Sequence, residues 1–142
     1  MDANSNLTLL VVKPDAVRRR IIGEIIRRVE ADGFAVRDAS FTQLDRERAE
    51  RFYAVHKGKE FYAGLVEFMT SGPVMALLIE REGGLSRLRQ LVGATDPKQA
   101  APGTIRADLG TSVRENVVHA SNPEENAREE ILFYFPQAFC KT

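Results

Sequence analysis

The amino-acid sequence predicts an α/β (α+β) sandwich in which helices cover a four-stranded sheet. Apolar stretches with the character of strands alternate with stretches of helical periodicity, in the order β-α-β-α-β-α-β. Two helices stand between the second and third strands, which fits a split βαβ, ferredoxin-like topology. The 142 residues suffice for one core, so residues 1–142 are interpreted as a single domain. The pattern also predicts that the helices cover one face of the sheet.

The first strand and the first helix show different apolar patterns. Leu7–Val12 is almost continuously apolar, which is typical of a strand buried on both faces, and Lys13-Pro14-Asp15 ends it. A helix with one apolar face follows and closes at Asp32-Gly33. The residues of that face are Ile22, Ile25, Ile26 and Val29.

The second strand is predicted over residues 34–42. Its alternation changes phase between Val36 and Phe41, which indicates a β-bulge. Asp45 then has the chemistry of a helix N-cap, and the turn around Gly58 breaks the helix that follows. The apolar positions of that helix are Ala49, Phe52 and Tyr53.

The third strand is predicted over residues 74–79, with one helix before it in the sequence and one after it. The helix before it stops at Ser71-Gly72-Pro73, and its apolar stripe is formed by Phe61, Leu65, Phe68 and Met69. The helix after it is indicated by Leu85, Leu88, Leu91 and Val92. Residues 93–115 then show no sustained period, and a loop of that length in a compact domain is usually functional.

The fourth strand, Val117-Val118, follows this loop directly, and His119 stands where the strand ends. Ser121, Asn122 and Pro123 predict the start of a last helix, with Pro123 at the first helical position. Glu124 and Glu125 fall in its first turn, where the helix dipole favours negative charge.

His119 is the first candidate catalytic residue. The last helix buries Ala127 and Ile131, so Glu130 borders the buried face. An unpaired carboxylate there is costly, and the nearest partners are Ser121 and His119. A carboxylate that orients an imidazole prepares a histidine for chemistry, although a lone histidine at a strand end is more often structural.

Composition argues against some classes of function and indicates the compartment of the protein. Hydrophobic residues make up 44% and charged residues 28%, and 20 basic and 20 acidic residues give a net charge of zero. A balanced charge argues against sequence-independent nucleic-acid binding. The single cysteine, Cys140, forms no internal disulfide, and no apolar run approaches a membrane span or a signal peptide. We therefore expect a cytoplasmic protein with no membrane partner.

Several motifs in one order resemble those of nucleoside diphosphate kinases. Asn116-x-x-His119-Ala-Ser121, with Glu130 eleven residues after the histidine, is similar to the active-site signature of that family. Ala120 stands where the family often has Gly, Asn122-Pro123 where it has Asp-Ser, and Glu60 where it has Pro. The other matching segments are Leu10-Val-Val-Lys-Pro-Asp15, Phe52-Tyr-Ala-Val-His-Lys57, Phe61-Tyr-Ala-Gly-Leu-Val66, Phe68-Met-Thr-Ser-Gly-Pro-Val74, Pro102-Gly-Thr-Ile-Arg106 and Ala127-Arg-Glu-Glu-Ile131.

The resemblance implies a ferredoxin-like βαββαβ fold with a four-stranded antiparallel sheet. It also implies an enzyme that transfers the terminal phosphate of a nucleoside triphosphate, typically ATP, to a nucleoside diphosphate. Transfer would follow a ping-pong mechanism through a phosphohistidine on His119. The Tyr53 hydroxyl would point at this histidine, with Ser121 and Glu130 beside it.

The resemblance also implies how the nucleotide is held. Lys13, Arg89 and Arg106 would contact the transferred and adjacent phosphates, for which planar guanidinium groups are suited, and Thr95 would hydrogen-bond the phosphate chain. Without the resemblance, Lys13 would be interpreted as a solvated loop lysine and Arg89 as a surface arginine.

A second set of residues would hold the nucleoside. Phe61 would stack on the base opposite Val113, Leu65 would line the cleft, and Asn116 would bind the sugar hydroxyl. Stacking with few base-edge hydrogen bonds tolerates every base. The other histidine, His56, is interpreted as a solvated loop residue.

No cluster of Asp, Glu and His has metal-ligand spacing, so the implied cofactor, Mg²⁺, would be held mainly by nucleotide phosphates and water. The implied partners are ATP and other nucleoside tri- and diphosphates. The family resemblance implies a homo-oligomer, either a tetramer or a hexamer.

Two other functions stay open on the sequence. A phosphohistidine relay domain would need His119 but not the Phe61 and Val113 pair. A non-catalytic nucleic-acid-binding member of the same fold would need neither His119 nor the set of cations, and the zero net charge disfavours it.

Overall fold

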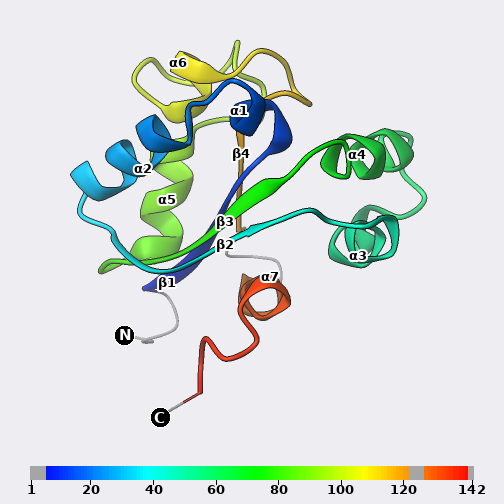
Figure 1. The fold of residues 1–142 in the computed structure, drawn as a ribbon. Helices are drawn as coiled ribbons and strands as arrows, with labels where there is room; N and C mark the ends of the chain where they lie inside the picture. Colours follow the sequence, from blue (N-terminus) through cyan, green and yellow to red (C-terminus); the bar gives the residue numbers. More distant parts are fainter. Residues whose placement is uncertain (1–5, 122–126, 141–142) are drawn as a thin grey trace.

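The computed structural model describes residues 6–121 and 127–140 (Figure 1). Its centre is a four-stranded sheet in the order β2-β3-β1-β4, and every neighbouring pair is antiparallel. This arrangement confirms the predicted ferredoxin-like α+β sandwich. The strands are β1 (Leu7–Val12), β2 (Ala35–Thr42), β3 (Val74–Glu80) and β4 (Val118–Ala120).

Helices fill the connections between the strands. Those before β3 are α1 (Pro14–Arg18), α2 (Ile22–Ala31), α3 (Arg46–Phe52), the short 3₁₀ helix η2 (Ala54–His56) and α4 (Tyr62–Met69). Those after β3 are α5 (Gly84–Val92), α6 (Ile105–Leu109) and α7 (Ala127–Tyr134). None of the helices in the described ranges combines the length and the apolar character needed to cross a lipid bilayer.

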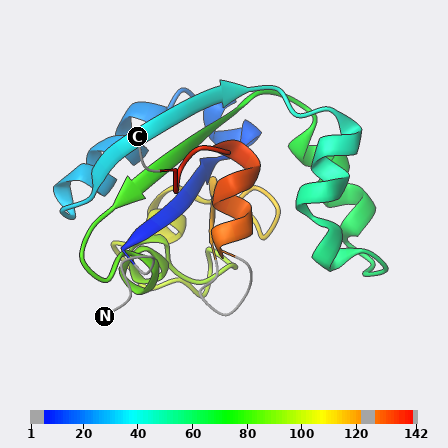
Figure 2. The same ribbon diagram turned by 90° about the horizontal axis from the view of Figure 1, so that it is seen from below.

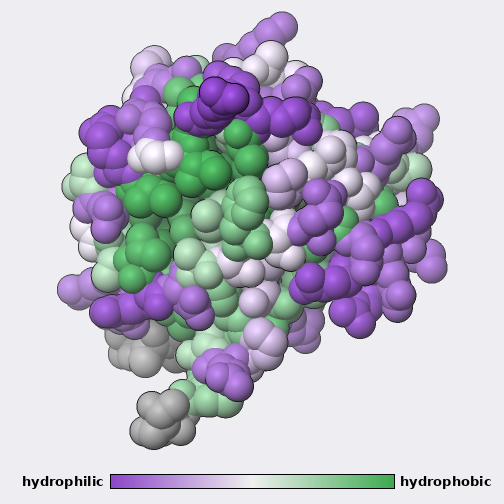
Figure 3. Space-filling view, viewed as in Figure 1, coloured by the Kyte–Doolittle hydropathy of each residue, from purple (hydrophilic) through white to green (hydrophobic). Residues whose placement is uncertain are grey.

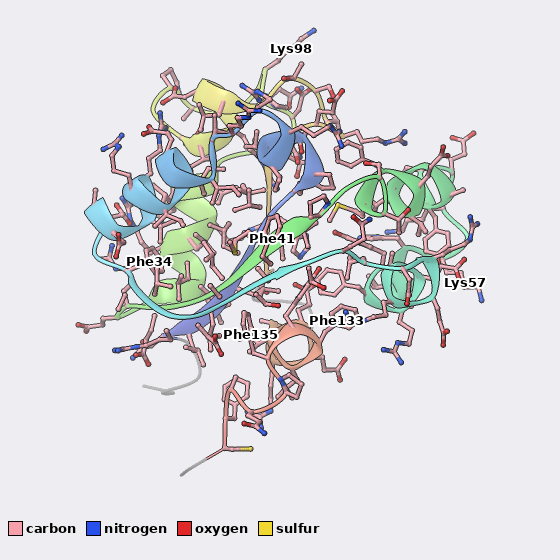
Figure 4. All side chains as sticks on the ribbon, in the orientation of Figure 1. Phe34, Phe41, Lys57, Lys98, Phe133 and Phe135 are labelled. Carbon is pink, nitrogen blue, oxygen red and sulfur yellow. The ribbon has the colours of Figure 1, made fainter. Side chains whose placement is uncertain are left out.

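Helices cover both faces of the sheet, so the prediction of one covered face is wrong. Leu10 and Val12 point into a core with α1, α2, α5 and α6, whereas Leu9 and Val11 point into a second core with α3, α4 and α7. Figure 4 shows Phe34 on the α2 side and Phe135 on the α7 side. The physical reason is in β1 itself, because a strand that is apolar at successive positions exposes apolar surface on both faces unless both are covered.

Two local predictions are confirmed. The register between β2 and β3 shifts between Val36 and Asp38, which is the bulge expected from the change of phase. The Arg48 N–H donates to the Asp45 carboxylate at 2.8 Å, so Asp45 caps α3.

Other local predictions differ from the structure. The sequence pattern missed α1, which begins with Pro14 directly after β1, and α6, which lies inside the predicted loop. β4 begins one residue later than expected and includes His119, whereas Val117 lies outside it with a positive φ of 67°. The predicted helix start at Asn122, Pro123, Glu124 and Glu125 lies outside the described residues.

The pair α3 and α4 projects from the ends of β2 and β3, beside the body of the sheet (Figure 2). The segment 93–116 contains α6, which packs with α5 on one face of the sheet. It therefore lies on the opposite side of β4 from α3 and α4. These two parts of the chain form the walls of the site, and β4 lies between them.

Candidate active site

His119 lies in β4, where it is paired in register with Val11 of the central strand β1. Its Nε2 lies 2.9 Å from Oε1 of Glu130 on α7, and the Ser121 hydroxyl donates to the same oxygen at 2.9 Å. The structure therefore brings together the three residues that sequence reasoning placed side by side. One carboxylate oxygen fixes the imidazole from the side of α7.

The charge of Glu130 is maintained in spite of its surroundings. Burial alone would raise the pKa of this carboxyl group. The neighbouring His119 and the hydrogen bonds from His119 and Ser121 outweigh burial, so the pKa of Glu130 lies below its ordinary value. A carboxylate in this state accepts the N–H of the imidazole over the whole neutral range.

Aromatic rings enclose the imidazole from the α3 side. The Phe52 ring meets His119 edge-on with ring centroids 5.3 Å apart, and the Tyr53 ring does so at 6.0 Å. Burial, with smaller contributions from Tyr134 and Glu130, raises the pKa of Tyr53 well above its ordinary value, so its hydroxyl stays protonated. Tyr53 is near the histidine as predicted, and Phe52 joins it there.

A buried network surrounds Lys13, whose side chain is 5% exposed. Its ammonium group donates to the Arg114 carbonyl oxygen and to Oδ1 of Asn116, both at 2.8 Å. The Asn116 amide in turn donates to the Thr95 carbonyl oxygen at 3.0 Å. Burial lowers the pKa of Lys13 to about 8, with Asp15 acting in the opposite direction.

Two arginines stand on the side of α5 and α6. Arg106 is buried and donates to the carbonyl oxygens of Val118 at 2.8 Å and Gly93 at 3.2 Å, which fixes its guanidinium group beside β4. Burial and the nearby charge of Arg89 lower its pKa to about 10. Arg89 itself donates to the Ala120 carbonyl oxygen at 3.4 Å.

These side chains line one pocket of about 490 Å³. Phe61 and Val113 stand on its walls with 45% and 56% of their surface exposed, so neither belongs to the core, which is the usual place for such residues. All the predicted nucleotide-binding residues line this pocket, together with Tyr53 and His119, whereas Ser121 and Glu130 lie behind the histidine. The predicted set is Lys13, Phe61, Leu65, Arg89, Thr95, Arg106, Val113 and Asn116.

Sequence reasoning missed four residues of the pocket, of which Val118 and Ala120 flank His119 in β4 and His56 and Arg114 lie on other segments. His56, interpreted as a solvated loop residue, lines it instead, with its ring centroid 5.1 Å from that of Phe61 and 6.5 Å from that of Tyr53. Arg114 lines it beside Val113, and its guanidinium group lies against Gly64 of α4. The only signal in the sequence was the position of Arg114 between two predicted ligands, Val113 and Asn116.

Comparisons with known proteins agree with this geometry. The sequence model of the family described as nucleoside diphosphate kinase matches residues 6–139. A nucleoside diphosphate kinase of Bordetella petrii is 52% identical over 130 residues, which is 92% of both chains. One of Rubrobacter xylanophilus is 51% identical over 128 residues, which covers 90% of this chain and 96% of that protein.

Solved structures extend the likeness to three dimensions. The nucleoside diphosphate kinase of Aquifex aeolicus superposes with a TM-score of 0.89 at 41% identity, covering 92% of this chain and 94% of that chain. A halophilic one from Halobacterium salinarum, solved in complex with CDP, gives a TM-score of 0.88 at 43% identity, covering 91% of this chain and 86% of that chain. The chain described here belongs to the nucleoside diphosphate kinase family.

Proposed function

We propose that the chain transfers the terminal phosphate of a nucleoside triphosphate, typically ATP, to a nucleoside diphosphate through a phosphohistidine on His119. The observation that carries this proposal is the bond between His119 Nε2 and Glu130 beside a pocket lined by Lys13, Arg89 and Arg106. The bond commits one imidazole nitrogen to the protein. The other nitrogen, Nδ1, is then available to a phosphate in the pocket.

The first half-reaction forms one bond and breaks another. The lone pair of Nδ1 attacks the γ-phosphorus, and the bond from that phosphorus to the β-phosphate oxygen breaks, so the diphosphate leaves with the electron pair. The ring then carries a positive charge, which the Glu130 carboxylate stabilises through the Nε2 proton. In the second half-reaction a terminal oxygen of the acceptor diphosphate attacks the same phosphorus and releases His119 unchanged.

The cations stabilise charge that moves during these steps. Arg106 is fixed by two carbonyl oxygens and Lys13 by two acceptors, so neither side chain needs to reorganise when the phosphoryl group transfers. Arg89 adds a third positive charge on the α5 side. Lys13 and Arg106 are buried, so their charges act in a medium less polar than water, which strengthens their attraction for phosphate.

The nucleoside fits the remaining part of the pocket. The exposed ring of Phe61 and the side chain of Val113 offer apolar surfaces to a base, and Leu65 lines the same pocket. Asn116 also lines it and is held by Lys13 and Thr95, so its amide would be in place to bind a hydroxyl group of the sugar. Stacking of this kind accepts purines and pyrimidines.

Mg²⁺ fits this site only as part of the nucleotide. The charged side chains that line the pocket in the described residues are cationic, so phosphate oxygens and water, and not carboxylates, would bind the ion. Bound there, it would neutralise part of the charge of the phosphates. The residues that hold the metal–nucleotide complex would be Lys13, Arg89 and Arg106.

We also propose that copies of the chain associate as a homo-oligomer, a tetramer or a hexamer, in the cytoplasm. β2 is an edge strand, and Figure 3 shows apolar surface gathered on the side of β2 and α2. Phe41 of β2 is 58% exposed there, and an uncovered edge strand with apolar neighbours favours association. A single cysteine fits a reducing compartment.

Labelling with phosphate tests the proposed function. Incubation with γ-labelled ATP and Mg²⁺ should give a labelled protein that loses its label to added GDP, and the label should be acid-labile and base-stable. The chain has two histidines, so His119→Ala should remain unlabelled, while His56→Ala, the matched control, should still be labelled. Stable labelling of His119→Ala, or transfer that requires both nucleotides at once, would reject the proposal.

A further inference from the structure

Val117 has a backbone conformation that a valine rarely adopts. Its φ is 67°, in the left-handed region, where β-branched residues are outliers. The Val118 N–H donates to the Asn116 carbonyl oxygen at 2.8 Å, a bond that spans only three residues. This bond together with a positive φ at the central residue is typical of the strained form of γ-turn.

This γ-turn, formed by Asn116, Val117 and Val118, leads from one residue of the active site to another. Asn116 is its first residue and is bound to Lys13 and to Thr95. His119 directly follows its last residue and lies in β4, in register with β1. The turn therefore decides how the Asn116 amide lies relative to the imidazole, and both groups would have to contact one bound nucleotide.

Both backbone groups of Val117 are bound by the segment that follows β1. The Val117 carbonyl oxygen accepts the Lys13 N–H at 2.9 Å. The Val117 N–H donates to Oδ2 of Asp15 at 3.2 Å, which is the only side-chain hydrogen bond to the backbone of Val117 in the described residues. Strained conformations persist only where their surroundings fix them, and these two bonds do so here.

Asp15 is buried near Lys13, and the two opposite charges favour each other, but this interaction leaves part of the carboxylate unsatisfied. It is 3% exposed, its Oδ1 has no hydrogen-bond partner in the described part of the chain, and burial raises its pKa above the ordinary value. It does not line the pocket, so it does not reach a substrate. A buried carboxylate with one unbonded oxygen is unfavourable for the fold, which points to a role other than stability.

We propose that Asp15 is a positioning residue, whose carboxylate holds Val117 in the γ-turn and thereby keeps Asn116 and His119 in register on one nucleotide. The inference rests on the proposed phosphohistidine mechanism. Loss of the Asp15 carboxylate releases the Val117 N–H, and the valine then relaxes towards the negative φ that it prefers. The imidazole and the amide lose their mutual alignment, although both side chains remain.

The test combines Asp15→Ala with Val117→Gly, because glycine adopts a positive φ without strain. The rate of His119 phosphorylation is measured in a single turnover at saturating ATP and Mg²⁺. Asp15→Ala should slow it on the order of tenfold, the scale of a lost orienting partner, whereas Asp15→Asn should retain most of the rate because the amide oxygen can accept the same N–H. Adding Val117→Gly to Asp15→Ala should restore most of the lost rate.

Thermal unfolding separates positioning from folding. Val117→Gly alone should remain folded and phosphorylate within a few-fold of the parent rate, and it serves as the reference for the double variant. If the double variant is as slow as Asp15→Ala, or slower, or if Asp15→Asn is as slow as Asp15→Ala, the inference is wrong. If the parent chain itself forms no phosphohistidine, the proposed function fails, a result distinct from failure of rescue.

Discussion

Burial and charge oppose each other most directly at Lys13. Its ammonium group is almost fully enclosed, and burial brings its pKa from 10.5 to about 8 although Asp15 lies nearby. The acceptors of Arg114 and Asn116 compensate for part of the lost hydration. A lysine held in this way is ready to meet a phosphate, which would restore the charge that burial disfavours.

The first prediction concerns the pH dependence of turnover. The free enzyme should lose kcat/KM as pH rises through about 8, because Lys13 then loses the charge that binds phosphate. Bound phosphates favour the charged lysine, so the decline in kcat should begin at a higher pH than the decline in kcat/KM. The Lys13→Ala variant should be slow and should lack this limb; an unchanged alkaline limb in that variant would assign it to another group.

The free energy of unfolding should rise over the pH range in which kcat/KM falls. The folded chain releases the Lys13 proton near pH 8 and the unfolded chain near 10.5, so between these values the unfolded state binds more protons. The contribution of Lys13 to the free energy of unfolding therefore rises from about pH 8 to 10.5. Denaturant unfolding of the parent against Lys13→Ala measures this difference, and a difference that falls with pH over this range would refute it.

Glu130 carries the third prediction at this scale. Glu130→Gln should keep the fold and slow formation of the phosphohistidine by about tenfold, because a neutral amide stabilises the phosphorylated, cationic ring less well. Glu129→Gln is the matched control, since Glu129 is its exposed neighbour on α7. Stopped-flow or quenched-flow labelling compares the two variants. Equal rates for both would show that the carboxylate does not prepare the histidine.

At the scale of elements, the site is closed by a contact between the segment 93–116 and α4. The guanidinium group of Arg114 lies so close to Gly64 that a Cβ there would stand 2.5 Å from Nη2 and 2.8 Å from Cζ. The Arg114 carbonyl oxygen is held by Lys13 at the same time. One residue therefore connects the cationic part of the pocket to the wall that carries Phe61 and Leu65.

The fourth prediction uses this contact. Gly64→Ala should displace the flexible end of Arg114, leave α4 folded, and raise the KM for nucleotide about two- to fivefold, the scale of one exposed charge interaction. Turnover at saturation should hardly change. Gly23→Ala in α2 is the control, because a Cβ there meets nothing within 4 Å. Steady-state kinetics decide, and a fall in kcat with KM unchanged would contradict this view of the wall.

Local patterns predicted the elements that carry a clear signal. The pairing of Glu130 with His119 followed from helical spacing, since Ala127 and Ile131 fix which side of α7 is buried. The helix α6 has only five residues, too few to show a period, so the sequence pattern predicts a loop there. Phe52, His56 and Arg114 could not be placed near the site, because their position depends on how α3, α4 and the segment 93–116 fold against each other.

At the scale of the whole molecule, the two-faced sheet explains why the site lies where it does. Each face of β1 and β3 has its own core, and the pocket draws residues from both sides, with Phe61 and Leu65 from the α3 and α4 side and Arg89 and Arg106 from the α5 and α6 side. β4 lies between these sets and carries His119. A rigid sheet thus positions His119, and under the proposed function the two sides would supply the base and phosphate contacts.

The most direct test of this account is to determine which nitrogen of His119 carries the phosphate. Nε2 is engaged by Glu130 at 2.9 Å, so the phosphorylated chain should contain phosphate on Nδ1. ³¹P and ¹⁵N NMR of the enzyme phosphorylated with ATP and Mg²⁺ distinguishes the two positions. Phosphate on Nδ1 of His119 is the predicted result. Phosphate on Nε2 would require the bond to Glu130 to break before chemistry, and it would contradict the account.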